Sequence, residues 1–174
     1  MKLKVFRFIS RIACCLALLS GGACSNIDCP LDNIVGMTVN LYSAEKRTSL
    51  TLTDTLTVRS AGADTLLLNR GYALSTFIIP LRYETGTDTL LFRFSNNKGQ
   101  VATDTIFLHQ EARHHFENLD CPAAIFHKLR KVRWTSHALR LMPLTIDSVA
   151  FGQTLVNYDD IENLRVYLRS TASE

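Results

Sequence analysis

The feature that most constrains the fold of this chain is an alternation of apolar and polar residues that recurs between residues 37 and 169. Successive side chains of a β-strand point to opposite faces, so a period of two predicts half-buried strands. The clearest runs are 37–42, 50–58, 77–83, 90–94 and 164–169, and the shorter candidates are 65–69, 103–109, 129–134 and 145–151. Helix signals are limited to two single turns, at 122–128 and 158–162.

Short polar or glycine-bearing segments separate the predicted strands. The links at 61–64, 85–88 and 96–99 have the length and composition of hairpin turns, and the last joins 90–94 to 103–109. Many short strands with such links predict an all-β fold, a single antiparallel β-sandwich that could be immunoglobulin-like. We expect this domain to span residues 35–170.

The first 23 residues have the three parts of a secretory signal peptide. Four basic residues lie within the first eleven, an apolar run follows at 12–19, and small residues occupy 20–23. A membrane-spanning helix is the alternative, but it needs about 20 consecutive apolar residues, and Arg7 and Arg11 interrupt the run.

A cysteine follows the small residues directly. Bacterial lipoprotein processing acylates a cysteine at this position, so we predict lipid attachment at Cys24 and a lipid-anchored tether at 24–34. The pattern departs from a lipobox because Gly21 stands where leucine is commonest. Cleavage by ordinary signal peptidase, which would release a soluble protein, is the alternative interpretation.

The remaining cysteines after residue 24 are Cys29 and Cys121. In an oxidising compartment such a pair is most simply one disulfide. Closing a loop of this length stabilises a fold by roughly 4–5 kcal/mol in the chain-entropy model. A metal site is the alternative, but the two cysteines lack neighbouring residues with ligand spacing.

Removal of the signal peptide changes the charge. The loss of four basic residues from 19 leaves 15 against 16 acidic residues, so the mature net charge is −1 rather than +3. A nearly neutral chain gives no general electrostatic reason to expect a nucleic-acid partner.

The order of several short motifs resembles a family of small Bacteroides-type lipoproteins of unknown function. The features that carry this resemblance are Cys24, Cys29, Asp54-Thr55-Leu56, Pro80-Leu81, Cys121, Thr145-Ile146-Asp147-Ser148-Val149 and Asn163-Leu164-Arg165-Val166-Tyr167. One departure is Cys121-Pro122, where the family pattern has cysteine followed by glycine. The resemblance implies a cell-envelope location and a β-rich fold, and it implies no particular activity.

The densest basic stretch is 127–134. The favoured interpretation is an amphipathic strand with a basic polar face and Trp134 in the core. The functional alternative is contact with lipid phosphates or an anionic glycan, with Trp134 stacking on a sugar. The residues of this candidate surface are Lys128, Arg130, Lys131, Arg133 and Trp134.

No catalytic, metal or cofactor motif is recognisable. His114 and His115 cannot face one ion together with His109, because neighbours in a strand point to opposite faces. The recurrent Asp-Thr-Leu segments have spacings that fit no calcium loop, and they are better explained as turn closures before strands. A Ser-His-Asp triad assembled from distant positions remains open, since triads are defined by geometry.

Three functions follow in order of preference. The first is a non-enzymatic interaction or structural domain of the cell envelope, held at the membrane by the N-terminal lipid and contacting envelope proteins. The second is a ligand-binding module, with a glycan as ligand, and the third is an envelope hydrolase. We expect an outer-membrane lipoprotein that faces the periplasm, because the residues after Cys24 contain a single acid before Cys29 and position 25 is serine, not aspartate.

Overall fold

The computed structural model describes residues 29, 35–62 and 64–171. The predicted signal peptide 1–23, the lipid site Cys24 and all of the tether 24–34 except Cys29 lie outside the described residues. The described part of the chain contains ten strands: β1 (Gly36–Ser43), β2 (Thr55–Ser60), β3 (Thr65–Gly71), β4 (Thr76–Pro80), β5 (Thr87–Ser95), β6 (Val101–His115), β7 (Ala124–Thr135), β8 (Leu144–Phe151), β9 (Leu155–Val156) and β10 (Leu164–Ser170). No helix long and apolar enough to cross a membrane occurs among these residues.

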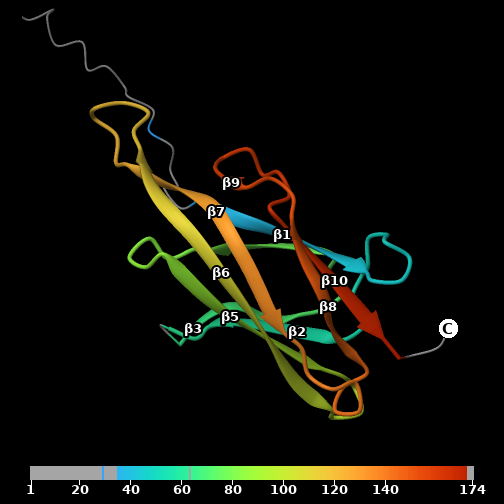
Figure 1. The fold of residues 1–174 in the computed structure, drawn as a ribbon. Helices are drawn as coiled ribbons and strands as arrows, with labels where there is room; N and C mark the ends of the chain where they lie inside the picture. The colour runs from blue at the N-terminus through green and yellow to red at the C-terminus, as the bar shows by residue number, and fades with distance from the viewer. Residues whose placement is uncertain (1–28, 30–34, 63, 172–174) are drawn as a thin grey trace, which may run out of the picture.

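The strands form two sheets that pack face to face (Figure 1). The four-stranded sheet has the order β4-β1-β10-β8 and the six-stranded sheet has the order β3-β2-β5-β6-β7-β9. The predicted all-β sandwich is confirmed. One pair departs from the antiparallel expectation, because the first and last strands, β1 and β10, run parallel with Val39 opposite Leu164.

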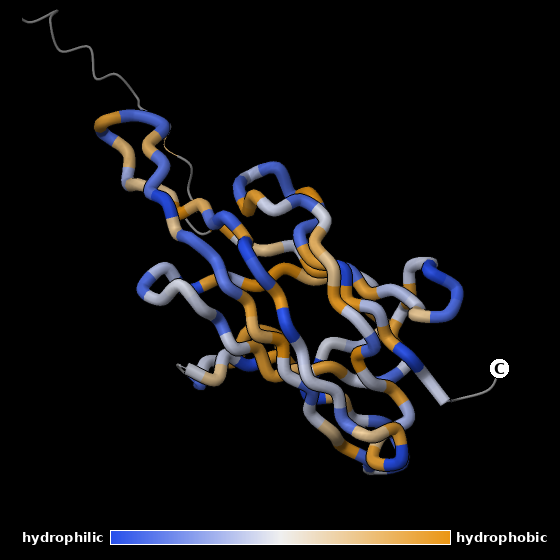
Figure 2. Tube along the Cα trace, viewed as in Figure 1, coloured by the Kyte–Doolittle hydropathy of each residue, from blue (hydrophilic) through white to orange (hydrophobic). Residues whose placement is uncertain are grey.

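The core lies between the two sheets and is built from the apolar positions of the alternation. Figure 2 shows hydrophobic positions recurring along the strands of both sheets. Burying each large apolar side chain completely stabilises the fold by roughly 1.5–3 kcal/mol. The largest of these side chains are Phe92, Phe94, Met37, Leu41, Leu52, Leu56, Ile79, Leu90, Ile106, Leu108, Met142 and Ile146.

Two strands were predicted with one wrong boundary each. The run at 50–58 predicted one strand, but β2 begins at Thr55. Residues 50–54 instead lead from one sheet to the other, with the Leu50 N–H donating to Leu41 of β1 and the Leu52 N–H to Leu74. The run at 77–83 ends early because Pro80, which has no N–H to donate, closes the edge strand β4.

The hairpin of β6 and β7 is longer than predicted. β6 continues six residues past the predicted end at 109, and β7 starts at Ala124, where a helical turn over 122–128 was expected. Pairing between the two strands holds this extension, from Gln110 opposite Leu129 to His115 opposite Ala124. The second predicted helical turn, at 158–162, is an irregular connection between β9 and β10.

The predicted disulfide is confirmed. Cys29 and Cys121 are bonded, with their Cα atoms 5.5 Å apart and a sequence separation of 92. Cys121 follows the turn that ends the β6–β7 hairpin, so the bond attaches the N-terminal segment to the tip of that hairpin.

Candidate functional site

A β-bulge in β7 determines which face of the strand carries the predicted basic residues. Leu129 pairs with Gln110 and Lys131 pairs with His109, so Arg130 has no opposite residue in β6. One extra residue shifts the alternation of side chains by one position. Near the bulge, side chains therefore point outward at Lys128 and Arg130 before it and at Lys131 and Arg133 after it.

The bulge brings four of the five predicted site residues onto one surface. Each of the four is exposed or half-buried, whereas the inward residues His127 and Leu129 are both 2 % exposed. We call this surface the cationic face of β7, and its residues are Lys128, Arg130, Lys131 and Arg133.

Two cations of this face have fixed partners. Arg130 donates to the Glu111 carboxylate at 2.5 Å, and this hydrogen bond holds the pKa of Glu111 below its usual value. The Lys128 ammonium donates to the Thr154 hydroxyl at 2.7 Å. Arg133 lies over the ring of Phe107 at 5.9 Å. Within the described residues, neither Lys131 nor Arg133 forms an ion pair with a carboxylate.

Trp134 does not belong to this surface, and its predicted core position is wrong. It points to the inner side of β7, where it pairs with the buried Ile106, yet it is 36 % exposed. Its indole N–H donates to the Asp147 carbonyl of β8 at 3.1 Å. The short strand β9 pairs only with His127 and Lys128, so the later part of β7 lies at an open edge of the sandwich. Trp134 covers part of that edge, on the side of β7 opposite to the cations.

Exposed aromatic rings in the described part of the chain do not form a coplanar platform of the kind that binds sugars. Phe126 meets Tyr158 edge-on at 86°, and it stacks on the imidazole of His115 with ring centroids 4.3 Å apart. Tyr72 and Tyr83 are 67 % and 61 % exposed but lie in separate connections. The glycan alternative therefore rests on charge rather than on stacking.

One histidine lies beside an aspartate, as the hydrolase alternative requires. Asp104 is fully buried, and His137 donates to its Oδ1 from the backbone N–H at 2.6 Å and from Nδ1 at 2.7 Å. The other ring nitrogen, Nε2, faces the Met142 carbonyl at 3.2 Å, and the Ser136 hydroxyl donates to Ile146. With Nε2 turned to a backbone carbonyl, this pair has no serine to activate, and its geometry is that of a link between the sheets.

A second buried polar network lies where β6 and β7 leave the sandwich. Gln110 donates to the carbonyls of Arg82 and Thr85 at 2.6 and 2.9 Å, so its Oε1 is free to accept from His127 Nδ1 at 2.9 Å. Arg82 Nε donates to the buried Asp88 carboxylate at 3.1 Å. Burial lowers the pKa of His127, and the nearby Asp88 charge opposes this shift only in part.

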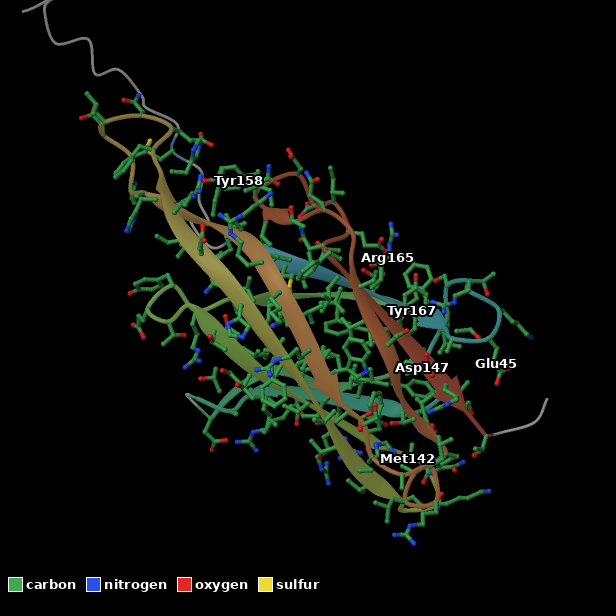
Figure 3. All side chains as sticks on the ribbon, in the orientation of Figure 1. Glu45, Met142, Asp147, Tyr158, Arg165 and Tyr167 are labelled. Carbon is green, nitrogen blue, oxygen red and sulfur yellow. A yellow bond between two sulfur atoms is a disulfide. The ribbon has the colours of Figure 1, made fainter. Side chains whose placement is uncertain are left out.

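Sequence reasoning missed a cluster on the outer face of the four-stranded sheet. Tyr42 donates to Glu162 at 2.5 Å, Arg165 also donates to Glu162, and Tyr42 and Tyr167 have ring centroids 5.4 Å apart. Hydrogen bonding to Glu162 raises the pKa of Tyr42. Figure 3 shows Arg165 and Tyr167 along β10. Only the parallel pairing of β1 with β10 places the tyrosines opposite each other, so no local pattern could predict this cluster.

A cleft of about 260 Å³ lies near the opposite end of the sandwich from the disulfide. Its polar lining includes Asp54 and Lys98, and burial raises the pKa of Asp54. The lining contains neither aromatic nor histidine side chains. Metal ligands are also lacking, since no three His, Cys, Asp or Glu side chains in the described part of the chain could hold an ion.

Comparison with protein families matches residues 55–168, from the start of β2 into β10, to a family of unknown function (DUF6452). No curated protein and no solved structure matches the chain. The matched segment covers more than half of the chain and contains Cys121 and the whole cationic face of β7. The chain therefore belongs to the DUF6452 family of unknown function.

Proposed function

We propose that this protein is an exported lipoprotein of the cell envelope, anchored through Cys24, whose β-sandwich is a non-enzymatic interaction domain. The Cys29–Cys121 disulfide carries the proposal, because such bonds persist in oxidising compartments outside the cytosol. It also accounts for both cysteines that follow residue 24 and leaves Cys24 for acylation. The burial and complete hydrogen bonding of the Asp104–His137 pair support a structural rather than a catalytic role for that pair.

The anchor is tested by metabolic labelling with a fatty acid and by membrane fractionation. Cys24→Ser should abolish the label and move the protein to the soluble fraction. The matched control is Cys15→Ser, the same exchange within the apolar run of the signal peptide, which should leave both results unchanged. Persistent labelling of Cys24→Ser would contradict the anchor.

The proposed orientation is in the outer membrane with the domain facing the periplasm. Serine at position 25 lacks the aspartate associated with retention in the inner membrane, and a single acid lies between Cys24 and Cys29. Protease added to intact cells should leave the domain intact and digest it only after the outer membrane is permeabilised. Digestion in intact cells, with a periplasmic protein surviving, would indicate surface display.

The second candidate is binding of an anionic glycan at the cationic face of β7. The bulge that aligns four cations on one surface favours it, because closely spaced charges attract a polyanion at low ionic strength. The probe is a polyuronate compared with neutral dextran. The double variant Lys131→Gln/Arg133→Gln should lose polyuronate binding, whereas Lys98→Gln, an exposed cation in the β5–β6 turn, should retain it. Equal binding by both variants would rule out this face.

A further inference from the structure

The β6–β7 hairpin projects beyond the body of the sandwich (Figure 1). Pairing of β5 with β6 ends at Thr87 opposite His109, while β6 and β7 stay paired as far as His115 opposite Ala124. Every residue from 111 to 120 is exposed. The end of this hairpin is therefore free to contact a surface that the rest of the domain does not reach.

Two large apolar side chains occupy the end of the hairpin. Leu119 is 97 % exposed and Phe116 is 64 % exposed. Leu119 lies inside a turn closed by the Cys121 N–H, which donates to the Asn118 carbonyl at 3.2 Å. This hydrogen bond closes the turn around Leu119, and the Leu119 side chain stays in water. In Figure 2 the tip of the hairpin carries hydrophobic colour beside hydrophilic segments.

The neighbouring connection between β9 and β10 adds apolar surface at the same end of the molecule. Ile161 is 51 % exposed and Tyr158 is 38 % exposed. Figure 3 shows Tyr158 on the side of the domain toward the hairpin tip. Large apolar side chains that stay exposed at one end of a domain make that end a candidate interaction surface.

The disulfide ties this tip to the proposed anchor. Cys121 lies two residues after Leu119, and its Cα is 5.5 Å from that of Cys29. Cys29 is five residues from Cys24, a tether that spans no more than about 18 Å when fully extended. If the acyl chains of Cys24 lie in a bilayer, the hairpin tip is the part of the described domain held closest to it.

The charges around the hairpin tip indicate which kind of interaction with a bilayer is favourable. Glu117 and Asp120 flank Leu119, and Arg113 lies in the stem of the hairpin. Acidic neighbours do not favour attraction to anionic headgroups. Contact must come from the apolar side chains entering the boundary between headgroups and acyl chains, as in other interfacial segments.

We propose that Phe116 and Leu119 insert into the interface of the membrane that holds the Cys24 lipid, giving the domain a second attachment point that fixes its orientation. This inference rests on the proposed lipid anchor. It differs from docking through the cationic face of β7, because insertion of apolar side chains is insensitive to salt, whereas headgroup attraction is screened.

The test places a single tryptophan at the tip. In the full-length lipidated protein, Trp134→Phe removes the native tryptophan and Leu119→Trp introduces a reporter. The matched control in the same background is Tyr72→Trp, a 67 % exposed position between β3 and β4. Both proteins are reconstituted into phosphatidylcholine vesicles whose acyl chains carry bromine, and vesicle flotation reports the anchor independently.

Insertion predicts that the position 119 reporter shifts to shorter wavelength and is quenched at least twofold, with the position 72 reporter unchanged, in both low and high salt. Unquenched emission at 119 from protein that floats with the vesicles would overturn the inference and leave the anchor standing. Protein that neither floats nor is quenched would overturn both. If Trp134→Phe does not fold, Trp134 is retained in every protein. Insertion at the tip is then measured as the extra quenching of the Leu119→Trp protein relative to the protein with Trp134 alone.

Discussion

The hydrogen bonds of Asp104 make this residue the most informative site for a stability measurement. It lies in β6 of the six-stranded sheet, and its Oδ2 accepts from the Ile146 N–H at 2.7 Å and the Thr145 hydroxyl at 3.0 Å, both in β8 of the other sheet. Its Oδ1 accepts both hydrogen bonds from His137. Asp104→Asn keeps the shape of the side chain but replaces one acceptor oxygen with a donor group.

The cost of this substitution follows from the donors that lose an acceptor. In the less damaging orientation the new amide faces Ile146, and leaving that buried N–H unpaired costs about 1–3 kcal/mol. Loss of the negative charge weakens the remaining hydrogen bonds to His137 by about 1 kcal/mol. Thr145 can turn its hydroxyl to the His137 carbonyl, 3.3 Å away, so it adds little. Unfolding should therefore require about 2–4 kcal/mol less free energy.

Urea denaturation followed by Trp134 fluorescence measures this loss. The control is Asp64→Asn, because Asp64 pairs with Arg59 at 2.7 Å on the surface and its side chain is 84 % exposed. Exposed pairs contribute about 1 kcal/mol or less, so the control should unfold nearly like the wild type. A loss below about 1 kcal/mol for Asp104→Asn would refute the idea that this carboxylate links the sheets.

Three further predictions concern other buried groups. Burial lowers the pKa of His127 below the value of about 6.5 that histidine has in an unfolded chain, so its stabilising contribution is complete above that pH and declines as the pH falls. His127→Gln should therefore show a smaller difference in the free energy of unfolding between pH 7.5 and 5.5 than the wild type, and an equal difference would contradict this. Thiol labelling of denatured, non-reduced protein should leave Cys29 and Cys121 unreacted, and modification of both would exclude their disulfide. Phe92→Ala should lower the free energy of unfolding by about 3–5 kcal/mol, measured by urea denaturation, because the ring is fully buried.

The sequence was sufficient for the fold class, most strands and the disulfide. Burial in a strand follows from alternation, which is a local property, so Met37, Leu41 and Phe92 could be assigned to the core before any pairing was known. The cysteine pair followed from counting the cysteines after residue 24, on the expectation that the chain is exported. The exposed end of the β6 extension, at 111–115, could not be predicted, because all of its residues except Ala112 are polar or charged and only pairing with β7 makes them a strand.

The candidate surface depends on the sequence and on the pairing of the strands. Its basic residues were evident in the sequence, yet alternation alone assigns Lys128 and Arg130 to one face of a strand and Lys131 and Arg133 to the other. Only the register with β6 reveals the bulge at Arg130 that unites them and turns Trp134 away to the open edge. Side-chain periodicity is encoded residue by residue, but a bulge exists only between two paired strands, so tertiary structure alone decided which surface the charges share.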